Sequence, residues 1–119
     1  MKKENFKTGK LGESLAGRYL QRKGYRIKEC NFSTRFGEID IICYDAQILV
    51  FVEVKTKIGH DFGEPEEMVN KRKLSQVKRM GEVYLQDNNL DVPCRVDVVA
   101  VVLNQNKEVE RIDHYQGVY

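Results

Sequence analysis

The chain has 119 residues, of which 41% are hydrophobic and 32% are charged, and its formal net charge is +2. This length and composition predict one soluble globular domain, spanning residues 1–119, with a single core. No apolar run approaches the roughly 18 residues that a membrane span requires, and the polar first residues lack the apolar core of a signal peptide. We therefore expect a cytoplasmic protein without a membrane partner.

The cysteines and the distribution of charge restrict the classes of function that the chain can have. Cys30, Cys43 and Cys94 show no CxxC spacing, so we interpret them as reduced thiols and not as zinc ligands or disulfides. Residues 1–30 contain nine Lys or Arg and three acids, which leaves a net charge of −4 for the remainder. A basic region beside an acidic one is typical of a solvated helix, and also of a protein that contacts phosphodiesters.

The first predicted element is a helix over residues 10–23, which carries apolar side chains at helical spacing and ends before Gly24. Residues 1–8 are charged, and we expect them to be flexible. Glu13 borders the apolar stripe of this helix. On the residues alone it has two interpretations: an acid that complements the helix dipole, worth about 0.3–1 kcal/mol, or a carboxylate that leans toward a site.

A short strand over residues 25–31 and a turn over 33–35 lead into a predicted hairpin. Its two apolar runs cover residues 39–44 and 48–54, with a turn signal at 45–47 between them. Glu38, at the start of the hairpin, is either an additional site carboxylate or a solvated acid at a strand end.

Three charges interrupt these apolar runs: Asp40 in the first, and Glu53 and Lys55 in or just after the second. A buried ionised group costs several kcal/mol unless it is paired or bound to a metal. Glu53 and Lys55 share one face of their strand. A hairpin loop of two or four residues puts Asp40 on that face, whereas a loop of three puts it on the other.

The second half of the chain predicts a loop, a helix and two strands. The loop covers residues 57–65, the helix 66–86, a strand buried on both faces 95–103, and a more exposed strand 108–114. Lys73 falls inside the apolar stripe of the helix, where it either snorkels to solvent or reaches Glu53 or a bound phosphate. Arg95 and Asp97 share a face as an ion pair or as contacts behind a site. His60 and His114 lack partners at ligand spacing, so we expect both on the surface.

These elements follow the order α-β-β-β-α-β(-β), which predicts an α/β fold with a mixed β-sheet flanked by helices. Four motifs then carry a family resemblance: residues 31–33 (NFS), 35–40 (RFGEID), 51–55 (FVEVK) and 95–99 (RVDVV). Together they resemble the YraN-like family of small bacterial proteins, which belongs with the PD-(D/E)xK nucleases and is related to Holliday-junction resolvases. Ile39 stands where the motif's name has Pro. The resemblance implies a restriction-endonuclease-like sandwich.

The resemblance also implies a site and an activity. Asp40, Glu53 and Glu13 would bind Mg²⁺ or Mn²⁺. Carboxylate oxygens are hard ligands, and hard divalent cations prefer such ligands. Lys55 and Lys73 would act beside them. The residues expected around the site or its substrate are Glu38, Arg35, Gln76, Arg95 and Asp97.

The function implied is a metal-dependent endonuclease that hydrolyses phosphodiester bonds of structured DNA. Nucleic acid would lie along the basic N-terminal region and residues 57–63, and a homodimer would supply two sites for cutting a junction. Three alternatives remain open on the sequence: a nucleic-acid-binding accessory protein that does not cut, a structural or interaction protein with no nucleic-acid role, and a structural ion-pair cluster of Asp40, Glu53 and Lys55.

Overall fold

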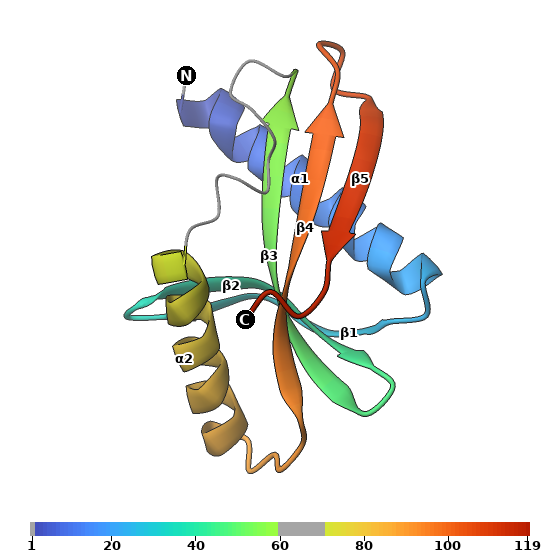
Figure 1. Ribbon diagram of the computed structural model, residues 1–119. Coiled ribbons are helices and arrows are strands. Elements are labelled where there is room, and N and C mark those ends of the chain that lie inside the picture. The colour runs from blue at the N-terminus through green and yellow to red at the C-terminus, as the bar shows by residue number, and fades with distance from the viewer. Residues whose placement is uncertain (1, 60–70) are drawn as a thin grey trace.

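The computed structural model describes residues 2–59 and 71–119, which form two helices and five strands (Figure 1). In chain order these are α1 (Lys2–Arg22), β1 (Arg26–Thr34), β2 (Gly37–Asp45), β3 (Ile48–Ile58), α2 (Lys71–Asp87), β4 (Cys94–Leu103) and β5 (Val109–Tyr115). The order and the α/β class are those predicted from the sequence. None of the described helices is long and apolar enough to cross a membrane.

The five strands form one mixed sheet in the order β1-β2-β3-β4-β5. Neighbouring strands are antiparallel except for β3 and β4, which run parallel and are connected through the segment that contains α2. Parallel neighbours need such a crossover, because a tight turn can join only antiparallel strands. Figure 1 shows β3, β4 and β5 side by side in the upper half and the β1–β2 hairpin reaching toward α2.

The two helices cover opposite faces of the sheet, because side chains of β3 alternate between two apolar clusters. Val50, Val52 and Val54 pack in the cluster that contains Ala16 and Leu20 of α1. Leu49 and Phe51 pack in the cluster that contains Leu74, Val77, Met80 and Tyr84 of α2. Strand β4 is buried from Val96 to Leu103, which confirms the prediction of a strand covered on both faces.

Several boundaries differ from those predicted. Helix α1 begins at Lys2 and not at the predicted residue 10: this Lys-rich stretch has no proline, and the helix continues through it. Strand β1 extends to Thr34 and β3 to Ile58, which shortens the expected turn and loop. The remainder of that loop and the predicted start of the second helix lie outside the described residues.

Helix α1 lies very close to β3 at Gly12. A Cβ atom at this position would lie 1.7 Å from Oγ1 of Thr56, well inside the contact distance of two heavy atoms. Only glycine fits there without a displacement of the helix or the strand. This contact fixes the position of the helix at the next residue, Glu13.

Candidate metal centre

The turn between β2 and β3 decides the position of Asp40. Asp45 pairs with Ile48, so the hairpin loop has two residues, and Ala46 adopts a positive φ of 54°. The paired register ends at Ile41 and Val52, and the next residues along the two strands are Asp40 and Glu53. An even loop is therefore confirmed, and it brings these two carboxylates to the same end of the hairpin.

The side chain of Asp40 lies where β2 and β3 separate. The backbone N–H of Val54 donates to Oδ2 of Asp40 at 2.8 Å, a bond that a strand carbonyl would accept in an unbroken ladder. The carboxylate of Asp40 interacts electrostatically with both Glu53 and Glu13. Asp40 lines a cavity of about 210 Å³ with Glu13 on the α1 side, while Glu53 lies on the face covered by α2. The expectation that an even loop puts Asp40 on the Glu53 face is therefore wrong.

Three acids meet on the α1 side of this gap. Glu13, Glu38 and Asp40 each place a carboxylate oxygen within 4.8 Å of the others. The side-chain amide of Asn31 donates to Oε1 of Glu13 and to Oε1 of Glu38, both at 2.9 Å. Lys10 donates to Oδ1 of Asn31 at 3.2 Å. One amide thus holds two of the three acids, Glu13 and Glu38, in place.

Asn31 is a site residue that the sequence reasoning missed. It adopts a φ of 54°, a conformation that Asn tolerates better than most residues, and this conformation accompanies its position at the edge of the cavity. The available signal was the NFS motif, in which an asparagine stands inside a strand-forming stretch where asparagine is disfavoured.

Glu53 is buried on the α2 side, where its side chain is 6% exposed. Its Oε1 lies 3.8 Å from Nζ of Lys73, so the structure brings together the two residues that the helical stripe suggested. Its Oε2 is buried and has no hydrogen-bond partner in residues 2–59 and 71–119. Burial raises the pKa of Glu53, and the ammonium groups of Lys73 and Lys55 oppose that rise.

Asp40 is also difficult to ionise. Burial, followed by the charge of Glu53, raises the pKa of Asp40 to about 7, although the Val54 N–H opposes this change. Buried carboxylates with raised pKa values and an unsatisfied oxygen mark a site where further positive charge would stabilise the ionised acids. A divalent cation that prefers oxygen ligands supplies that charge, so the residues present fit Mg²⁺ or Mn²⁺.

The other residues expected near the site separate into two groups. Lys55 follows Glu53 by two positions and interacts with it electrostatically. Arg35 lies at the tip of the β1–β2 hairpin, where its guanidinium is 4.8 Å from the centre of the Phe36 ring. Gln76 is exposed on α2. Neither Arg35 nor Gln76 belongs to the carboxylate cluster.

Arg95 and Asp97 form the ion pair that was one of the two alternatives. Nε of Arg95 donates to Oδ1 of Asp97 at 2.9 Å, and its Nη1 lies 3.0 Å from Oδ2 of Asp45. Asp97 is fully buried. Burial opposes its ionisation, but hydrogen bonds from His114, Arg95 and the Gly117 N–H hold the pKa of Asp97 below its usual value.

The expectation that His114 is a surface residue is wrong. Its side chain is 1% exposed, and Nε2 lies 2.8 Å from Oδ2 of Asp97. Nζ of Lys23 lies 2.7 Å from Nδ1. Because an ammonium only donates, Nδ1 accepts and Nε2 donates to Asp97. The partners of His114 lie 17 and 91 positions away, which a search for ligand spacing does not find. His60 lies outside the described residues.

Comparisons with known proteins agree with the motifs. The profile of a family described as "Uncharacterised protein family UPF0102" matches residues 12–101. This chain belongs to the UPF0102 (YraN-like) family. The UPF0102 protein of Alkaliphilus oremlandii is 43% identical over 118 residues, covering 97% of this chain and 99% of that protein. The UPF0102 protein of Caldanaerobacter subterraneus subsp. tengcongensis is 41% identical and fully covered on both sides. The UPF0102 match includes every carboxylate of the cluster and Glu53.

Proposed function

We propose that this UPF0102 protein is a metal-dependent endonuclease that hydrolyses phosphodiester bonds of structured DNA, using Mg²⁺ or Mn²⁺. The observation that carries the proposal is the Oε2 atom of Glu53. It is buried without a hydrogen-bond partner in the described part of the chain, next to Asp40, whose pKa is raised to about 7. A bound cation would remove both penalties at once.

Asp40, Glu53 and Glu13 are the residues that would hold the cation, and Glu38 is close enough to Glu13 and Asp40 to join them. When bound, such a cation supplies Lewis-acid polarisation of a phosphoryl oxygen and lowers the pKa of water. Asn31 fixes the orientation of Glu13 and Glu38 by donating to both. The arrangement keeps three acids within 4.8 Å of one another, where their like charges repel unless a cation offsets them.

The lysines of the site have a separate role. Lys55 and Lys73 place positive charge beside Glu53, and Lys10 places it beside Glu13 at 3.6 Å. A phosphodiester in the gap would meet these ammonium groups, which offset the negative charge that develops on the phosphoryl oxygens. Lys55 would also orient the attacking water, because an ammonium donates hydrogen bonds to oxygen.

Cleavage of a panel of branched, duplex and single-stranded oligonucleotides with Mn²⁺ tests the proposal. Glu53→Gln keeps the side-chain shape and removes its charge, so we expect a loss of at least about 100-fold in cleavage. Glu82→Gln, at an exposed position of α2, is the matched control and should cleave like the wild type. A wild-type protein that binds the panel but cuts none of it would contradict the proposal and favour a non-cleaving accessory protein.

Lys73→Met separates chemistry from packing at the second lysine. Methionine keeps the unbranched apolar stem and loses the ammonium that lies 3.8 Å from Glu53. We expect turnover to fall by roughly tenfold or more, with an unchanged thermal midpoint measured in the same buffer. Full activity in this variant would show that Lys73 only covers the edge of the core.

A further inference from the structure

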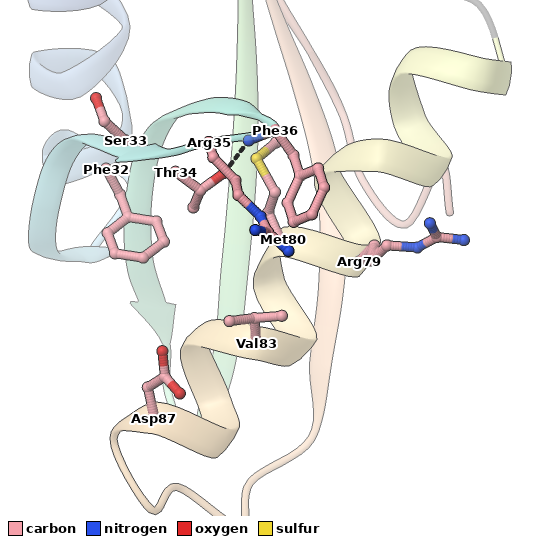
Figure 2. A pocket seen from close by; sticks show the side chains of 9 residues that line it. All are labelled: Phe32, Ser33, Thr34, Arg35, Phe36, Arg79, Met80, Val83 and Asp87. Atoms are coloured by element: carbon pink, nitrogen blue, oxygen red, sulfur yellow. Dashed lines mark hydrogen bonds between the residues drawn. The ribbon is translucent and has the colours of Figure 1, made fainter.

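A second hollow lies between the tip of the β1–β2 hairpin and α2, with a volume of about 490 Å³. Figure 2 shows the rings of Phe32 and Phe36 on the hairpin side and the apolar side chains of Met80 and Val83 on the helix. Phe36 is 58% exposed, although aromatic rings usually bury most of their surface. The hollow therefore presents aromatic and apolar walls to solvent.

The hairpin tip is held in shape by its own hydrogen bonds. Oγ1 of Thr34 accepts from the N–H of Phe36 at 3.0 Å and donates to the carbonyl of Gly37 at 3.2 Å. The Arg35 guanidinium stacks over the Phe36 ring. These contacts position Phe36 before any ligand arrives, which reduces the entropy lost on binding.

The charge around the hollow and its volume restrict the kind of ligand that it can bind. Two guanidinium groups, of Arg35 and Arg79, border the hollow, and Arg79 extends outward in Figure 2. The carboxylate of Asp87 lies at the end away from Phe36. The rim near Phe36 is thus positive, and the volume falls in the range of about 300–1,000 Å³ that accepts one small organic group. Aromatic rings and arginine beside a positive rim are the surfaces on which unpaired bases stack.

The hollow is connected to the carboxylate cluster by a hydrogen bond from one of its lining residues. Ser33 lines it, and the Ser33 hydroxyl donates to Oε2 of Glu38 at 3.4 Å. Glu38 is one of the three acids that meet around the cavity at Asp40. A nucleic-acid strand whose phosphate lies at the acids can therefore place a neighbouring base at the hairpin tip.

We infer that this hollow binds an unpaired nucleobase of the substrate, stacked against Phe36 and Arg35, next to the phosphate to be cut. The inference rests on the proposed function and specifies its substrate: DNA with an unpaired nucleotide, such as a flap or a branch point, in preference to continuous duplex. Phe36 would be a specificity residue that contacts the base and takes no part in the hydrolysis.

The test measures binding without cleavage, in EDTA, to flap oligonucleotides carrying 2-aminopurine, a fluorescent base whose emission falls when it stacks. We expect the wild type to quench an unpaired 2-aminopurine, and Phe36→Ala to weaken this binding by about tenfold to a hundredfold and abolish the quenching. Affinity for fully paired duplex should not change. Phe36→Trp, which retains a stacking ring, should restore both signals, and Val109→Ala, at an exposed apolar position of β5, should resemble the wild type.

Equal weakening of flap and duplex binding by Phe36→Ala would overturn the inference, as would a wild type that quenches no unpaired base. A cleavage assay run beside it separates the two proposals. If the wild type cuts and Phe36→Ala keeps the same flap-to-duplex preference, the base site is wrong and the nuclease stands. If quenching depends on Phe36 but nothing is cut, the base site stands and the nuclease is wrong.

Discussion

Asp40 shows how one side chain can serve the sheet and the site together. Its Oδ2 accepts the Val54 N–H, and its carboxylate lies in the group with Glu13 and Glu38. The sequence predicted a special role for Asp40 because a charge interrupts an apolar strand. It left the face open, because the length of the following turn was expected to decide it. The loop has two residues, yet Asp40 lines the cavity on the α1 side with Glu13, while Glu53 pairs with Lys73 on the α2 side.

The metal-free protein should lose stability as the pH rises, because of Asp40. A carboxyl whose folded pKa lies above its unfolded value stabilises the fold fully below the unfolded pKa, near 4. That contribution disappears as the pH rises through about 7. We expect the free energy of unfolding, measured with urea in EDTA, to fall by on the order of 2–4 kcal/mol between pH 4 and pH 8. Asp40→Asn should show a clearly smaller decline, and an identical decline would contradict this assignment.

Asn31 and His114 mark the limit of residue-scale prediction. Each acts through partners that are distant in sequence: Asn31 through Glu13 and Glu38, and His114 through Asp97 and Lys23. Neither spacing matches a known ligand pattern, so a single sequence gives no reason to group them. Lys73 and Glu53 could be paired in advance, because the helical stripe points to the same sheet face that strand alternation gives for Glu53.

At the scale of elements, the position of α1 depends on a residue that has no side chain. Gly12→Ala would force a Cβ atom against Thr56 of β3 and push the helix outward. We expect a destabilisation of about 1–3 kcal/mol, and a weaker Mn²⁺ affinity because Glu13 moves with the helix. Calorimetric titration with Mn²⁺ and urea unfolding measure the two effects.

Gly17→Ala is the matched control in the same helix. A Cβ atom there meets nothing within 4 Å, so the substitution should stabilise the protein by about 0.5–1 kcal/mol and leave metal affinity unchanged. A Gly12→Ala variant that behaves like Gly17→Ala would show that close approach of α1 and β3 does not position the acid.

The elements themselves were largely predictable, since the apolar periods are long and clear. Residues 95–103 read as a strand buried on both faces, and β4 is Cys94–Leu103. The ends of the elements were harder to predict. Strand β3 continues through Lys55 to Ile58 although polar residues fill that stretch, because its pairing with β4 continues to Leu103. Tertiary pairing of this kind overrides local composition.

At the scale of the whole molecule, the hydrogen bonds around Asp97 connect parts of the chain that are distant in sequence. Asp97 accepts hydrogen bonds from Arg95 in the same strand, His114 in β5 and the N–H of Gly117 beyond it. Arg95 and Gln116 also both donate to the hydroxyl of Tyr25, at 2.8 and 3.0 Å. The acid therefore connects β4 with β5 and the C-terminal segment.

Asp97→Ala should consequently destabilise the fold by about 3–5 kcal/mol, because it leaves Arg95 and His114 without their buried acceptor. Asp113→Ala removes an acid that pairs with Arg111 at 2.6 Å in a more exposed position, and it should cost less than about 1 kcal/mol. Urea midpoints of the two variants provide the comparison. Similar losses would show that Asp97 contributes no more than a surface pair.

The bond between Val54 and Asp40 also makes one backbone amide a spectroscopic indicator of the site. Its hydrogen is held by a carboxylate oxygen and not by a strand carbonyl, so its chemical shift follows the charge on that carboxylate. In a ¹⁵N-labelled sample, the Val54 resonance should move along a titration curve centred near pH 7, while amides bonded to carbonyls in β3 stay in place. Added Mn²⁺ would broaden that resonance, and diamagnetic Mg²⁺ would shift it. This single resonance therefore reports both protonation and metal binding at Asp40.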